Sequence, residues 1–220
     1  QNTTMEVIDF FKGHIRGRKG NMIFFVRNDK LHIKRYAIPG KPRKWEEKGR
    51  TTKQQEVTTR FTAVQWFYRE YMKQVSPDVW RAAAKPKRRT APNLFHSTNA
   101  RCFNGQGELV DFENFVFTQG TLALPRNLQV TREGNHFRVT WQEERHWTTT
   151  ARTDTMQVGI LYDNLQRSPR LAPNVKGCRG DLQGEFTLDE RLGTSAHVYI
   201  FFVGNNGTDF STSWHARVEL

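Results

Sequence analysis

"FTQGTL", residues Phe117–Leu122, separates two kinds of sequence pattern in this 220-residue chain. Before this stretch, from about residue 52, apolar residues recur at the spacing of helices, and after it they alternate with polar residues in short runs. The switch predicts an α+β N-terminal unit, residues 1–120, with a β-hairpin and two or three helices. It predicts an all-β sandwich of about seven strands over residues 121–220.

After the switch, six short runs are rich in β-branched and aromatic residues and are separated by turn formers. They are "NLQVTR", "HFRVTWQ", "TMQVGILYD", "GEFTL", "HVYIFFVG" and "SWHARVEL". In the second run the alternation points Phe137, Val139 and Trp141 inward. The fifth run is apolar at successive positions and therefore predicts a central strand that is buried on both faces.

Before the switch, the sequence predicts two helices and offers a third, shorter one. Thr52 and Gln55 have the form of a capping box, Ser76 and Pro77 predict the second start, and Thr90 predicts the third. The first helix carries an apolar and aromatic stripe that is expected to be core: Val57, Phe61, Val64, Phe67 or Tyr68, and Tyr71. The other helices are expected to bury Trp80, Ala84, Leu94, Phe95, Ala100 and Phe103.

The opening stretch predicts a β-hairpin, because "NMIFFVR" and "KLHIKRY" flank the turn formers Asn28 and Asp29. In this register Arg27 faces Lys30 and Phe24 faces Ile33. One side of the hairpin is then apolar, with Met22, Phe24, Val26, Leu31 and Ile33. The other side carries Ile23, Phe25, Arg27, Lys30, His32 and Lys34.

Positive charge is concentrated in the first half of the chain. Residues 1–110 hold 23 Lys and Arg against 9 Asp and Glu, whereas residues 111–220 hold 11 against 13. This asymmetry favours a polyanionic partner for the first half, and a basic surface kept for solubility is the simpler alternative. The residues expected to bind nucleic acid or another polyanion are Arg16, Arg18, Lys19, Phe25, Arg27, Lys30, Lys34, Lys41, Arg43, Lys44, Lys87, Arg88 and Arg89.

The glycine-rich opening "GHIRGRKG", residues 13–20, matches neither a Walker loop nor a dinucleotide-binding fingerprint. Its backbone amides could cradle a phosphate. Glycines that let the chain turn closely against a sheet are the stronger interpretation.

No catalytic, metal-binding or cofactor-binding motif is recognisable, so no catalytic residue, metal or cofactor is expected. The seven histidines are scattered, and Cys102 and Cys178 make no disulfide framework. The longest apolar run, Val198–Val203, is too short to cross a bilayer, and the N-terminal residues do not resemble a secretory signal. The expected location is the cytoplasm or a virion, although a signal that had been cleaved would leave no trace.

Pro125, Trp141 and Tyr199 occupy places comparable to those of the proline, tryptophan and tyrosine of fibronectin type III domains. The C-terminal half therefore resembles a fibronectin type III-like or immunoglobulin-like sandwich. The wider layout consists of "GHIRGRKGN", a "T.KQQ…RF" helix, "APNLFHSTN", "FTQGTLALPRNLQV" and "AHVYIFFVGNNG". Over nearly all 220 residues it resembles a Bacteroidota family of unknown function, and its opening is similar to those of small phage and prophage proteins.

This resemblance implies an architecture and no mechanism. The function expected is that of a non-enzymatic structural or interaction protein, in a phage-like or mobile-element assembly, with a protein partner or self-assembly. The alternative is a nucleic-acid-binding protein without sequence preference that uses the basic N-terminal half. No small-molecule substrate is evident.

Overall fold

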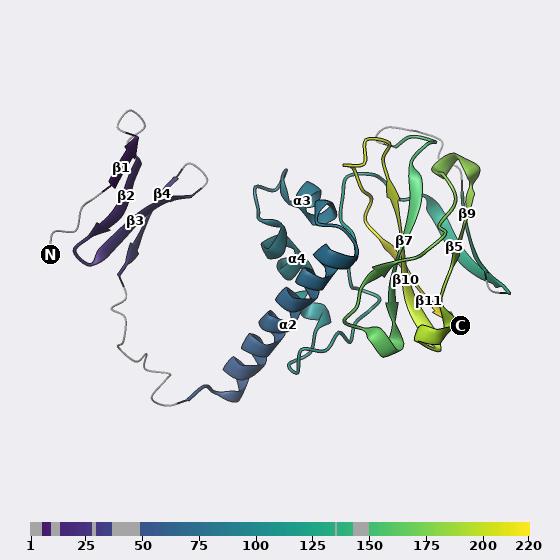
Figure 1. Ribbon diagram of the computed structural model, residues 1–220, viewed down its shortest axis with the longest axis horizontal. Coiled ribbons are helices and arrows are strands. Elements are labelled where there is room, and N and C mark those ends of the chain that lie inside the picture. The colour runs from purple at the N-terminus through teal and green to yellow at the C-terminus, as the bar shows by residue number, and fades with distance from the viewer. Residues whose placement is uncertain (1–5, 10–13, 28–29, 37–48, 135, 143–149) are drawn as a thin grey trace. The chain divides into compact units, whose positions relative to one another are not determined.

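The computed structural model describes residues 6–9, 14–27, 30–36, 49–134, 136–142 and 150–220. The chain divides into two compact units, residues 1–50 and 51–220, each of which is described by itself (Figure 1). The fold is α+β and rich in strands, with several antiparallel sheets. The predicted boundary near residue 120 falls inside the second unit, because the helices share a core with the strands that follow them.

The first unit is a four-stranded antiparallel sheet in the order β1-β2-β3-β4. Its strands are β1 Glu6–Asp9, β2 His14–Lys19, β3 Met22–Arg27 and β4 Lys30–Arg35. The predicted hairpin is confirmed in every pair from Met22–Arg35 to Arg27–Lys30, while its turn lies outside the described residues. "GHIRGRKG" was expected as a glycine-punctuated turn, but most of it forms β2, and Gly20 makes the turn to β3 with a φ of +58°.

Three helices begin the second unit: α2 Thr52–Gln74, α3 Asp78–Ala84 and α4 Ala91–Asn99, which continues as the 3-10 turn η1 Ala100–Cys102. The capping box lies one residue earlier than predicted. The hydroxyl of Thr51 accepts from the amide of Gln54, whose side chain accepts from the amide of Thr51. Helix α3 begins one residue later than predicted, because Pro77, expected at the first helical position, is the N-cap. Thr90 is the N-cap of α4, as predicted.

Only part of the predicted stripe of α2 is core. Val64, Phe67, Tyr68 and Tyr71 are buried, whereas Val57 is 64% and Phe61 52% exposed. The difference has a spatial cause, since the core reaches α2 only from about Ala63 onward. Helical periodicity identifies the face that points toward the core, but not how far the core extends along that face.

Seven strands follow in two sheets that pack face to face. One sheet has the order β5-β6-β9 and the other β11-β10-β7-β8. The strands are β5 Arg126–Glu133, β6 His136–Gln142, β7 Thr155–Tyr162, β8 Arg170–Leu171, β9 Gln183–Thr187, β10 Ser195–Val203 and β11 Trp214–Glu219. The six predicted runs correspond to all of these except β8.

Strand β10 separates two cores. Val198, Ile200 and Phe202 point into the sandwich, where they join Phe137, Val139 and Trp141. Tyr199 and Phe201 point the other way, toward the helices. The prediction of a central strand buried on both faces is therefore confirmed, and the second unit has three layers: helices, the β10 sheet and the β5 sheet (Figure 1).

The segment between the helices and β5 joins the helical layer to the sheet at Phe117. Its ring lies 5.3 Å from that of Tyr199 in a stacked arrangement and 5.1 Å from that of Tyr71 at an angle of 63°. Its carbonyl accepts from the indole Nε1 of Trp80 on α3, at 3.2 Å. Gly159 on β7 leaves the space for this ring, since a Cβ there would lie 2.2 Å from Phe117 Cε1.

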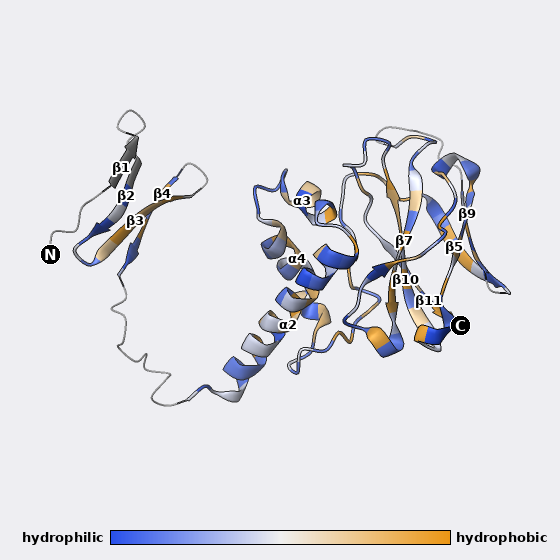
Figure 2. Cartoon of the chain, viewed as in Figure 1, coloured by the Kyte–Doolittle hydropathy of each residue, from blue (hydrophilic) through white to orange (hydrophobic). Residues whose placement is uncertain are grey.

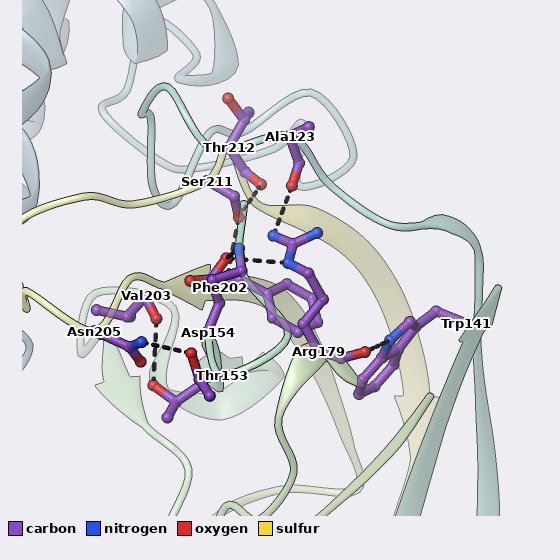
Figure 3. A network of polar contacts seen from close by, with 12 residues as sticks. Ala123, Trp141, Thr153, Asp154, Arg179, Phe202, Val203, Asn205, Ser211 and Thr212 are labelled. Atoms are coloured by element: carbon purple, nitrogen blue, oxygen red, sulfur yellow. Dashed lines mark hydrogen bonds and ion pairs between the residues drawn. The ribbon is translucent and has the colours of Figure 1, made fainter. Parts of the chain in front are cut away.

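A buried ion pair closes one end of the sandwich. Arg179 and Asp154 are only 1% and 4% exposed at their side chains, and Nε lies 3.2 Å from the carboxylate (Figure 3). Arg179 Nη2 also donates to the carbonyl of Ala123 at 2.7 Å, and Trp141 Nε1 donates to the Arg179 carbonyl at 2.9 Å. Since each partner of the pair has further hydrogen bonds, we assign this network a structural role.

The packing at Phe117 predicts that Gly159→Ala lowers the free energy of unfolding by about 2–3 kcal/mol, because the new methyl group collides with a buried ring. Denaturant unfolding of the full chain measures this loss. A second change, Phe117→Leu, removes the colliding ring edge, so the double variant is expected to be clearly more stable than the sum of the single effects. Strictly additive effects would contradict the assigned contact.

The ion pair predicts that Asp154→Ala costs about 3–5 kcal/mol, because it removes a buried carboxylate that the Arg179 guanidinium contacts. Glu190→Ala is the matched control. It breaks the Arg132–Glu190 pair, whose side chains are 41% and 53% exposed, and is expected to cost less than about 1 kcal/mol. Equal losses in the two variants, measured by thermal unfolding, would refute the difference in burial.

Candidate functional site

The sheet β1–β4 has two chemically different faces, because alternate residues of a strand point to opposite sides. We call one the apolar face; it consists of Met22, Phe24, Val26, Leu31 and Ile33. Met22, Leu31 and Ile33 are 51%, 43% and 57% exposed. Much of β3 is hydrophobic in Figure 2. Lys19 and Arg35 both lie opposite Met22, so they border this face at one end.

We call the opposite side the basic face; by register it consists of Arg16, Arg18, Ile23, Phe25, Arg27, Lys30, His32 and Lys34. The decisive pairing is that of Arg18 with Ile23, which puts the arginines of β2 on the same side as Phe25. Arg18, Lys30 and Lys34 are exposed, and Phe25 is partly buried. Strands β2 and β4 thus contribute cations to one surface, with Phe25 of β3 between them.

Two ring contacts order the side chains of the basic face. The guanidinium of Arg18 lies 3.5 Å from the ring centre of Tyr36, which follows β4, and its Nε donates to the carbonyl of Gly20 at 3.0 Å. Phe25 and His32 stack with centroids 5.4 Å apart at 18°, and Lys34 Nζ lies 5.7 Å from the Phe25 ring. Flat ring surfaces and cations therefore alternate across the face.

The acidic positions of the sheet lie on its first strand. The register places Glu6 opposite Arg16 and Asp9 opposite His14. In the described parts of β2, β3 and β4 every charged position is basic or histidine. Among the predicted cations Arg16 is therefore the one with an acidic residue directly opposite it, which makes it the least favourable for binding a polyanion.

The structure brings together only part of the predicted set of polyanion-binding residues. Lys19 lies on the apolar face and not with the other candidates. Lys41, Arg43 and Lys44 lie outside the described residues. Lys87, Arg88 and Arg89 belong to the second unit, where they follow α3, and Arg89 Nη1 donates to the hydroxyl of Ser97 at 3.1 Å.

Sequence reasoning named Arg16, Arg18 and Lys19 but missed that they lie on a strand, and it missed Tyr36. The alternation of His14, Arg16 and Arg18 was visible, but the glycines between them suggested a turn. Tyr36 follows the last strand residue, and its position two residues after Lys34 was the available signal that it shares the basic face.

The second unit brings together two histidines that the sequence showed only as scattered. His197 Nδ1 lies 2.8 Å from His215 Nε2, and the Phe112 ring stacks on His197 at 3.9 Å. Tyr199 donates its hydroxyl to the Phe112 carbonyl at 2.9 Å. Burial, together with the neighbouring His215, lowers the pKa of His197 to about 4, and burial also lowers the pKa of His215.

A hydrogen bond between two imidazoles requires one of them to accept, so both cannot be protonated. Arg217 opposes protonation of His197, while Asp163 favours it, and Asp111 and Glu113 favour protonation of His215. The pair fixes the loop that contains Phe112 against the β10 sheet. We assign it a structural role, since its ring nitrogens are directed at each other.

Within the described ranges, His, Cys, Asp and Glu side chains form no group of three or more that could hold a metal ion. Among the helices that the structure describes, none combines the length and apolar character of a membrane span. Cys102 and Cys178 are free thiols, and burial raises the pKa of Cys102 to about 11.

Comparison of the chain with models of known protein families and with curated proteins found no match.

The histidine pair predicts that stability falls as the pH drops from 6.5 toward 4. In this window the unfolded chain binds protons that folded His197 excludes, so acid favours unfolding. Solvent screening at these half-exposed rings reduces the expected loss to about 1–2 kcal/mol. Urea unfolding at pH 7, 6 and 5 measures it, and His197→Phe is expected to flatten the slope. An unchanged slope in that variant would exclude the pair as its source.

Proposed function

We propose that this chain is a non-enzymatic interaction protein that joins an assembly through the apolar face of its N-terminal sheet. The main support for this proposal is the exposure of that face. Every buried apolar residue among the described ones lies between Val64 and Phe210, so the described part of the sheet has no core of its own.

A single sheet with one apolar face is an incomplete fold, because a sheet normally buries that face against a second layer. The five side chains of the apolar face form a contiguous row over two paired strands. Exposed apolar surface of this kind marks sites of protein association. The second layer is supplied, in this proposal, by another subunit, which in the simplest case is a second copy of the chain.

The second unit serves in this proposal as a rigid carrier of the fibronectin type III-like class. Three observations support the class: Pro125 precedes β5, Trp141 lies inward on β6, and Tyr199 lies on β10, the strand before the last. The division into sheets of three and four strands agrees with such a sandwich. A phage-like or mobile-element assembly in the cytoplasm or a virion is the setting that the sequence resemblance favours.

Self-association is tested by the molar mass of the full chain in solution, measured by light scattering over a range of concentrations. We expect a dimer or larger species at about 10–100 μM that dissociates on dilution. The double variant Leu31→Gln/Ile33→Gln is expected to be monomeric over the same range. Lys30→Gln/Lys34→Gln changes the same strand on the basic face and is expected to associate like the parent.

A parent chain that stays monomeric at the highest concentration, and that forms no cross-link to a second subunit, would contradict the proposal. Equal loss of association in the two double variants would also contradict it, because the contact would not then be specific to the apolar face.

A further inference from the structure

The basic face remains unused when the apolar face is covered, because the two lie on opposite sides of one sheet. Its cations come from β2 and β4, and its rings are those of Phe25, His32 and Tyr36. Neighbouring strands of a sheet lie about 4.8 Å apart, so these groups fall within one small surface. A ligand on this surface meets positive charge and flat apolar rings together.

We infer that the basic face binds single-stranded nucleic acid, with its phosphates on Arg18, Lys30 and Lys34 and an unpaired base on Phe25. This site goes beyond the association through the apolar face. Aromatic side chains on a sheet, interleaved with cations, suit a single strand because every base has a face that can stack.

The arrangement of Arg18 favours binding. Its guanidinium is already held between Tyr36 and the Gly20 carbonyl. An ordered side chain loses less conformational freedom when it meets a phosphate, so more of the contact contributes to affinity. The stacked Phe25–His32 pair is ordered in the same way and offers a ring surface beside Lys34.

The rings favour a single strand over a duplex. In a duplex the base faces are stacked on one another, so Phe25 has no base surface to contact, and only the phosphate contacts remain. Phe25 lies near the middle of β3, among the cations and not at the margin of the face. A base can therefore stack on its ring while the neighbouring phosphates contact the cations.

The test uses the full chain and a fluorescent 20-nucleotide oligo-dT, with the matching dT·dA duplex and heparin as the other arms. Fluorescence anisotropy is expected to give micromolar affinity for the single strand at 50 mM salt. With three or four phosphates contacted, raising the salt to 200 mM is expected to weaken binding roughly 20- to 50-fold. The duplex is expected to bind more weakly than the single strand.

Matched variants separate the two faces. Lys30→Gln/Lys34→Gln is expected to lose roughly tenfold or more in affinity at 50 mM salt, while Lys19→Gln/Arg35→Gln removes the same charge from the other face and should lose less than about threefold. Phe25→Ala is expected to weaken single-strand binding about tenfold and duplex binding hardly at all, and Phe25→Tyr to restore it. Circular dichroism of each variant verifies the strands.

The inference is overturned if the chain does not bind the single strand at 50 mM salt, or if both charge variants lose affinity equally. It is also overturned if Phe25→Ala leaves single-strand affinity unchanged, or if heparin binds as tightly as the single strand, since the surface would then recognise charge alone. Failure of self-association has no bearing on these outcomes, because the control Leu31→Gln/Ile33→Gln keeps the basic face and is expected to bind the strand even as a monomer.

Discussion

The second unit depends on the contact of the Phe117 ring with the bare backbone of Gly159. The ring fills the space that a side chain on β7 would occupy, and it touches Tyr199 from the sheet and Tyr71 from α2. Trp80 donates to the carbonyl of the same residue, so α2 and α3 meet the sheet at one point. Through these contacts the helices and the β10 sheet share one core, and residues 51–220 form a single compact unit.

The first unit has no such core among its described residues. It satisfies its backbone in a four-stranded sheet but leaves both faces without a described layer, and the faces differ in chemistry. Covering an apolar face lowers the free energy, because apolar surface is removed from water. Binding of a polyanion to a basic face is favoured by the release of counterions. The two proposals therefore concern separate surfaces of one small sheet, and together they describe a chain that connects a protein assembly to a nucleic acid.

Much of this architecture could be predicted from the sequence, where local pattern decides structure. The hairpin register followed from Asn28–Asp29 and the alternation around it, and the two-sided burial of β10 followed from its continuous apolar run. The unit boundary could not be read in this way. Nothing local in "FTQGTL" reveals that Phe117 lies over Gly159, which is 42 residues away. The change of periodicity therefore suggested a domain boundary at this stretch, where the structure has a contact between the helices and the sheet.

For the candidate site, the composition indicated cations and Phe25 but not their grouping. Grouping depends on how β2 pairs with β3, and the glycines of β2 concealed the strand. The pairing assigns Arg18 to the basic face and Lys19 to the apolar face, although they are neighbours in sequence. The exposure of Val57 and Phe61 has a similar origin, because periodicity does not set where a core ends.

Native-state hydrogen exchange of the full chain tests the central claim most directly, that the helices belong to the same cooperative unit as the sandwich and that the N-terminal sheet is a separate unit. The account predicts that amides of α2 from Val64 onward and of α3 and α4 exchange with the same opening free energy as β7 and β10. The amides of β1–β4 are predicted to open independently and at a much lower free energy. Helices that open together with β1–β4, while the sandwich stays closed, would contradict the account.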